Sequence, residues 1–169
     1  MEESTIAFNA RAVFTWGSDR LYRVYVRDDA LYFIRIGGQG VGTAVAGQFG
    51  LVGALVGQAI KKRADAAREA KTAAQDQQDA QDLLAQHKDN FRLLPGEPVT
   101  ASIEPPAGPA GHGPHVARWL LVWSDRKWTL QFEQMIDAEM AMAHLPRFFG
   151  ERLKVNVRWD AGKKKYVKA

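Results

Sequence analysis

Apolar and β-branched residues alternate with polar ones along residues 11–36, which is the pattern of half-buried β-strands. Turn-forming residues interrupt the alternation at 17–19, and again at the Asp28-Asp29 pair, where a hairpin turn is expected. The segment therefore predicts a meander of three strands. In the middle strand, alternation divides the side chains between two faces: Tyr22, Val24 and Val26 on one, Arg23 and Tyr25 on the other.

A second β-rich region begins with a short predicted strand at 99–104. Residues 117–133 then alternate on both sides of a polar turn, which predicts a hairpin. One face of that hairpin carries three tryptophans: Trp119, Trp123 and Trp128. We interpret them as core residues, with an aromatic groove for a ligand as the alternative.

The chain after the hairpin predicts a helix and then an extended segment. Residues 135–144 place Ile136 and Met140 on one face, which is typical of an amphipathic helix. Pro146 has no backbone N–H to donate and is expected to kink or restart the helix. Residues 155–159 predict a late strand.

Between these regions the alternation disappears. Residues 36–60 hold no Asp, Glu, Lys or Arg and are rich in Gly and Ala. A polar stretch then runs to about Asn90 with neither Gly nor Pro, and its composition favours a helix. We predict helix over 43–88, as one long helix or a helical hairpin.

Small residues recur at helical spacing in this middle segment, as in a glycine zipper: Gly38, Gly42, Ala46, Gly50, Gly53, Ala54 and Gly57. On a helix they would form a smooth face that another backbone can approach closely. A single transmembrane span is disfavoured, because it would place the two β-rich regions on opposite sides of the membrane. Packing against another copy, against the same domain or in a membrane interface remains open.

Charge is concentrated at the C-terminal end. The last nineteen residues hold seven basic residues against two acidic ones, while the rest of the chain holds sixteen against seventeen. Because the body lacks a broad positive face, we expect no nucleic-acid binding. Two basic clusters are candidates for contact with an anionic membrane surface: Lys61, Lys62 and Arg63, and Lys163, Lys164 and Lys165.

Composition excludes several kinds of chemistry. The chain of 169 residues suits one domain with a large insertion, and without Cys it offers no disulfide or thiolate site. The first ten residues lack the apolar run of a secretory signal, so we expect a cytoplasmic protein, at the membrane periphery if the basic clusters bind lipid. His112 and His115 are too few to hold a metal, and Gly37-Gly38-Gln39-Gly40 lacks the Lys-Ser/Thr ending of a phosphate loop. We expect no enzyme and no cofactor.

The order of elements resembles the pleckstrin-homology-like superfold in its compact bacterial form. The segments that carry the resemblance are residues 21–34 and 117–149. It implies an α+β fold: a bent antiparallel β-sandwich or barrel of about six or seven strands with a C-terminal capping helix. This sequence would add a long helical insertion between strands 3 and 4. The domain would then be discontinuous, residues 1–37 and 91–169, with 38–90 inserted.

That fold hosts lipid, peptide and scaffolding functions alike and selects none of them. From the small-residue face we predict a non-enzymatic interaction module whose helical insertion mediates self-association or docking onto a protein partner. A membrane surface is one site where this docking could take place. The alternative is a peripheral membrane protein whose insertion lies in one leaflet, with the Lys and Arg clusters on anionic lipid.

Overall fold

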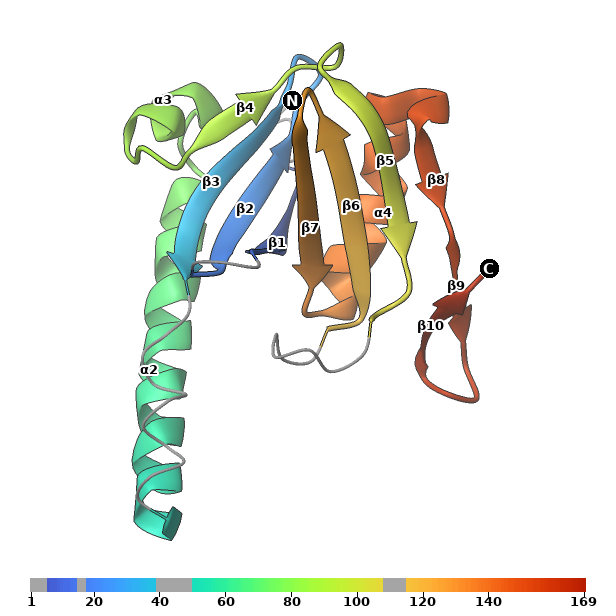
Figure 1. Cartoon of the computed structure of the whole chain (residues 1–169). Helices are drawn as coiled ribbons and strands as arrows, with labels where there is room; N and C mark the ends of the chain where they lie inside the picture. The colour runs from blue at the N-terminus through green and yellow to red at the C-terminus, as the bar shows by residue number, and fades with distance from the viewer. Residues whose placement is uncertain (1–5, 15–17, 39–49, 108–114) are drawn as a thin grey trace.

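The computed structural model describes residues 6–14, 18–38, 50–107 and 115–169 (Figure 1). Of these, the side chains of residues 50–61 and of residue 99 are not described.

Eight strands form one curled sheet in the order β4-β3-β2-β1-β7-β6-β5-β8 (Figure 1). Their bounds are β1 Ala7–Val13, β2 Arg20–Val26, β3 Leu31–Gly38, β4 Phe91–Leu93, β5 Pro98–Glu104, β6 Ala117–Trp123, β7 Arg126–Phe132 and β8 Leu153–Val155. Strands β9 (Val157–Asp160) and β10 (Lys165–Lys168) form a small separate sheet. The predicted meander and hairpin are thus confirmed, with β1 beginning four residues earlier than expected.

The main core lies on one face of this sheet and is rich in aromatic rings. Tyr22 and Val24 enter it from β2, as their alternation predicts, and Trp119 is fully buried within it. Phe33 and Phe91 stack with their ring centroids 4.5 Å apart, which joins β3 to the short strand β4. The three tryptophans of the hairpin belong to or pack against this core, so their interpretation as core residues is confirmed.

Helix α4, Met135–Phe149, covers part of the core face and contributes Leu145 and Phe149 to it. The helix runs through Pro146 to Phe149, further than the expected restart at that residue. Pro146 is exposed and lies in the last turn, so the hydrogen bond that its missing N–H cannot make is lost only near the end of the helix.

The expected sandwich or barrel of six or seven strands is wrong. One curled sheet holds eight of the described strands, and it is mixed, because β8 runs parallel to β5 with Ala101 opposite Leu153. The helix α4 is also not terminal, since three strands follow it. Gly150 explains the reversal: its positive φ of 57° ends α4, and the 3₁₀ turn Gly150–Arg152 returns the chain alongside β5.

The expected long helical insertion between the third and fourth strands is wrong as well, because the region is not a helical unit separate from the sheet. The described part of this region holds helix α2, Gly50–Gln75, a turn, and the short helix α3, Ala80–Ala85. The chain turns because Asp79 caps α3, its side chain accepting from the N–H of Gln81 at 2.7 Å. Helix α3 then packs Leu83 onto the outer face of the sheet, so it is part of the sheet's own packing.

Candidate functional site

Helix α2 is attached to the sheet by a carboxylate at its C-terminal end. Arg23 of β2 donates from Nε and Nη2 to the two oxygens of Asp76, at 3.2 and 2.8 Å. The Tyr25 hydroxyl donates to Asp76 Oδ1 at 2.7 Å. We call Arg23, Tyr25 and Asp76 the Asp76 clamp. Burial, and next the hydrogen bond to Asp76, raise the pKa of Tyr25 well above its usual value, so its hydroxyl keeps the proton that it donates.

A second polar attachment holds the segment after α3. The Asp89 carboxylate pairs with Arg35 and, at 3.5 Å, with Arg20. Burial acts to raise the pKa of Asp89, but these two guanidinium groups outweigh it and leave the pKa below its usual value. The Asp76 clamp precedes α3, and the ion pairs of Asp89 follow it. Together they hold the corner between the two helices on the outer face of the sheet.

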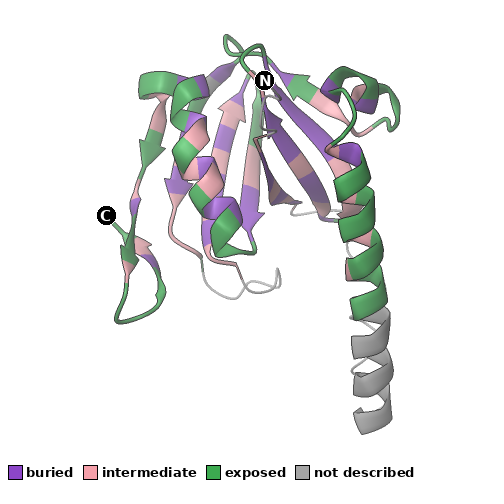
Figure 2. Cartoon of the chain, turned by 180° about the vertical axis from the view of Figure 1, so that it is seen from behind, coloured by how far each residue is buried: buried purple, intermediate pink, exposed green. Residues whose placement is uncertain are grey.

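The rest of α2 extends away from the sheet (Figures 1 and 2). Among the fourteen side chains described in it, residues 62–75, ten are exposed and only Gln75 is buried. Asp65, Arg68 and Thr72 are half-buried, and their spacing of three and four residues marks the side that faces the sheet. No helix among the described residues is both long and apolar enough to cross a membrane.

The structure places the predicted small-residue face only in part. Gly38 is the last residue of β3, opposite Arg20 of β2, so its assignment to a helical row is wrong. A Cβ at Gly38 would lie 3.2 Å from the backbone oxygen of Asp19, which explains a glycine there. Gly42 and Ala46 lie outside the described residues. Four of the predicted residues lie in helical backbone at the start of α2: Gly50, Gly53, Ala54 and Gly57.

The two basic clusters lie on separate elements. Lys61, Lys62 and Arg63 are near the middle of α2, and the described side chains of Lys62 and Arg63 are exposed. Lys163 and Lys164 are exposed in the turn between β9 and β10, and Lys165 is exposed at the start of β10. That turn and α2 extend toward the same end of the molecule from opposite flanks (Figure 1).

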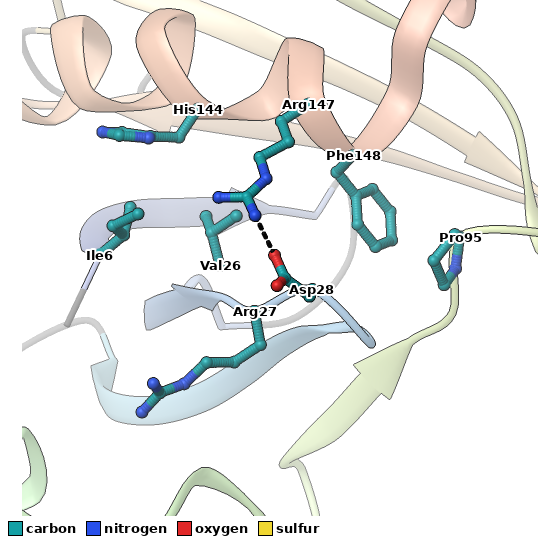
Figure 3. Close-up of a pocket in the computed structure, with 8 residues that line it drawn as sticks. All are labelled: Ile6, Val26, Arg27, Asp28, Pro95, His144, Arg147 and Phe148. Carbon is teal, nitrogen blue, oxygen red and sulfur yellow. Dashed lines mark ion pairs between the residues drawn. The ribbon is translucent and has the colours of Figure 1, made fainter. Parts of the chain in front are cut away.

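At the opposite end of the molecule, a cavity of about 210 Å³ opens between four segments that are distant in sequence (Figure 3). Its lining residues are Ile6, Val26, Arg27, Asp28, Pro95, His144, Arg147 and Phe148. Arg147 reaches from α4 to Asp28 of the β2–β3 turn, with Nη2 and Oδ1 2.6 Å apart. Sequence reasoning missed this cavity, at whose edge His144 is half-buried.

The histidine pair of the 105–115 loop lies only partly among the described residues. His112 lies outside the described residues, and His115 Nε2 accepts the N–H of Ala107 at 3.3 Å. Within the described ranges no three His, Asp or Glu side chains are grouped as metal ligands.

Comparison with protein-family models, with curated proteins and with solved structures finds no match to this chain. The resemblance of residues 21–34 and 117–149 to pleckstrin-homology-like proteins therefore stays a prediction, and function has to be argued from the geometry alone.

One buried polar atom at the C-terminal end of α2 gives a direct test of how that helix packs on the sheet. The side-chain oxygen of Gln75 is buried and has no hydrogen-bond partner among the described residues. Because an unsatisfied buried acceptor is costly, Gln75→Met should raise the free energy of unfolding by about 1 kcal/mol. Urea denaturation measures this change. Gln77→Met, at an exposed neighbour, should leave it unaltered, and a loss of stability in Gln75→Met would contradict the described packing.

Proposed function

We propose that this protein is a non-enzymatic interaction module that self-associates through α2. The observation that supports the proposal most is the position of this helix. It has 26 residues and is clamped at its C-terminal end, and its described side chains face mostly solvent. An isolated helix gains little in water without a packed face, so a helix held out in this way calls for a partner surface.

The composition of α2 favours a second helix as that surface. Each Gly costs a helix about 1 kcal/mol relative to Ala, and α2 carries Gly53 and Gly57 inside its first turns. Close contact with another backbone offsets such a cost, because glycine lets two helices approach where larger side chains would hold them apart. The uncharged half of α2, residues 50–60, is the part that we assign to this contact.

A peripheral membrane role is the second candidate, and the placement of the basic clusters supports it. Lys62 and Arg63 on α2 and Lys163–Lys165 at the β9–β10 hairpin are exposed, and α2 and that hairpin both extend toward the same end of the molecule (Figure 1). On an anionic surface each such charge contributes about 1 kcal/mol of attraction at low salt. The apolar start of α2 would then enter the headgroup region beside them.

Sedimentation velocity of the full chain without lipid, together with flotation on phosphatidylserine-containing and neutral vesicles, separates the two candidates. Self-association predicts a species heavier than the 18.8 kDa chain with no lipid present. The membrane candidate predicts an 18.8 kDa species that floats with anionic vesicles and loses flotation in Lys62→Glu/Lys164→Glu. Arg92→Glu, exposed on β4 at the other end of the molecule, is the control for charge alone. A chain that neither associates nor floats would refute both candidates.

A further inference from the structure

The cavity beneath Arg147 plays no part in the proposed self-association, because it lies at the end of the molecule opposite the start of α2. Its walls come from the chain before β1, the β2–β3 turn, the β4–β5 loop and the last turns of α4. Cavities at such junctions of several elements are common places for small ligands.

Hydrogen bonds to backbone carbonyl groups hold three of the walls in place. The N–H of Val26 donates to the Ile6 carbonyl at 2.9 Å, and the N–H of Arg27 donates to the Ala30 carbonyl at 3.1 Å across the hairpin turn. The Arg152 guanidinium donates to the carbonyl of Pro95 at 2.7 Å and to that of Pro98 at 2.8 Å. A ligand would therefore meet a cavity that is already formed, which lowers the entropic cost of binding.

The lining combines apolar walls with one accessible guanidinium. Ile6, Val26, Pro95 and Phe148 supply carbon surface, and Figure 3 shows Arg147 extending over them toward Asp28, while Arg27 points away. Arg147 and Asp28 are respectively 67% and 74% exposed, and an ion pair so open to water contributes little to stability. The Asp28 carboxylate thus marks the position at which a carboxylate can pair with Arg147. The weak ion pair leaves Asp28 free to be displaced from that position.

The size of the cavity limits what can fill it. At about 210 Å³ it is smaller than the cavities of about 300–1,000 Å³ that take drug-sized ligands. A nucleotide or a large cofactor is therefore too big. A group comparable to one amino-acid side chain fits, with its charge at the mouth.

We infer that this cavity binds a carboxylate carried on a compact apolar group, with the apolar group against Val26 and Phe148 and the carboxylate on Arg147 in place of Asp28. Arginine suits this role because its planar guanidinium can donate two parallel hydrogen bonds to one carboxylate. Two sources share the chemistry: a free small acid and the C-terminal residue of a peptide.

Titration of the ¹⁵N-labelled full chain tests the inference by NMR. The probes are 3-phenylpropanoate, and acetyl-Ala-Ala-Phe with a free C-terminus, each beside its uncharged amide. We expect saturable shifts of the Ile6, Val26 and Phe148 amides with the acid at millimolar concentration, and at least tenfold weaker binding of the amide. Tighter binding of the small acid identifies a free acid as the source, and tighter binding of the peptide identifies a chain end.

Three variants sharpen the test. Arg147→Gln should weaken binding of the acid at least tenfold, while Arg158→Gln, at an exposed arginine of β9, should leave it unchanged. Asp28→Asn should strengthen binding about threefold or more, because it removes the carboxylate that competes for Arg147. Weaker binding in Asp28→Asn, equal binding of acid and amide, or no shift of the cavity amides at 10 mM of either acid would overturn the inference.

Discussion

Asp76→Ala is expected to destabilise the protein by about 2 kcal/mol, because it removes the single carboxylate that receives both Arg23 and Tyr25. The Arg23 side chain is 17% exposed and that of Asp76 is 29% exposed, so water can replace only part of what is lost. Breaking a fully buried pair costs about 3–5 kcal/mol, and the partial exposure here brings the expected value below that range. Thermal unfolding should shift down by about 4–8 °C for a chain of this length.

Asp65→Ala is the matched control for this prediction. Asp65 lies on the same helix and is 3.6 Å from Arg68, but its side chain is 45% exposed, so its removal should cost less than about 0.5 kcal/mol. Hydrogen exchange gives a second readout: in Asp76→Ala, the amides of residues 66–75 should exchange faster, since the helix has lost its attachment. Equal effects of the two variants on unfolding would mean that the clamp does not hold α2.

Gly53→Leu is expected to weaken self-association at least thirtyfold, which corresponds to about 2 kcal/mol. Leucine is a better helix former than glycine by about 0.8 kcal/mol, so α2 itself should become more stable in the isolated chain. Gly53→Leu should thus weaken self-association while it stabilises the helix. A loss of association accompanied by unchanged or higher helix content can therefore be attributed to the blocked approach of a second backbone and not to unfolding.

Sedimentation equilibrium of the variant measures the association constant, and circular dichroism measures the helix content. Ala67→Leu, at an exposed position of the clamped half of α2, adds the same side chain away from the proposed contact and should associate like the unmodified chain. If Gly53→Leu associates normally, the small-residue face of α2 is not where two copies meet.

Local pattern was enough to predict the strands of the meander and of the hairpin, and the two faces of β2, but not β4, β8 or β10. Tyr22 and Val24 enter the core while Arg23 and Tyr25 point outward, because side chains alternate strictly along a strand. The helix after the β6–β7 hairpin was predicted as well, but its predicted face is wrong: Ile136 is exposed, and Ala138, Ala141 and Leu145 are among the buried residues. What alternation could not reveal is which strands meet: β8 pairs with β5 through a reversal at Gly150, and nothing within residues 153–155 indicates that partner.

The features that matter for function depend on contacts between distant segments. Asp76 is one acidic residue in a polar stretch, and its role follows only from Arg23 and Tyr25, 53 and 51 residues earlier. Those two residues did carry a signal, since an arginine and a tyrosine side by side on an outward strand face need a polar partner. The cavity at Arg147 had no such signal, because its walls are ordinary residues brought together by four segments.

The contact between two copies of α2 can be measured directly, because the chain has no cysteine of its own and a single introduced one can be labelled cleanly. In Gln58→Cys carrying a nitroxide, pulsed electron resonance should detect an intermolecular distance below about 25 Å. Packed helices lie about 8–10 Å apart. Residue 58 is five residues from Gly53, which is about 7.5 Å along the helix axis. The same label at Glu151→Cys should give a clearly longer distance. Absence of any intermolecular distance at residue 58, at protein concentrations where the chain is heavier than 18.8 kDa, would contradict self-association through α2.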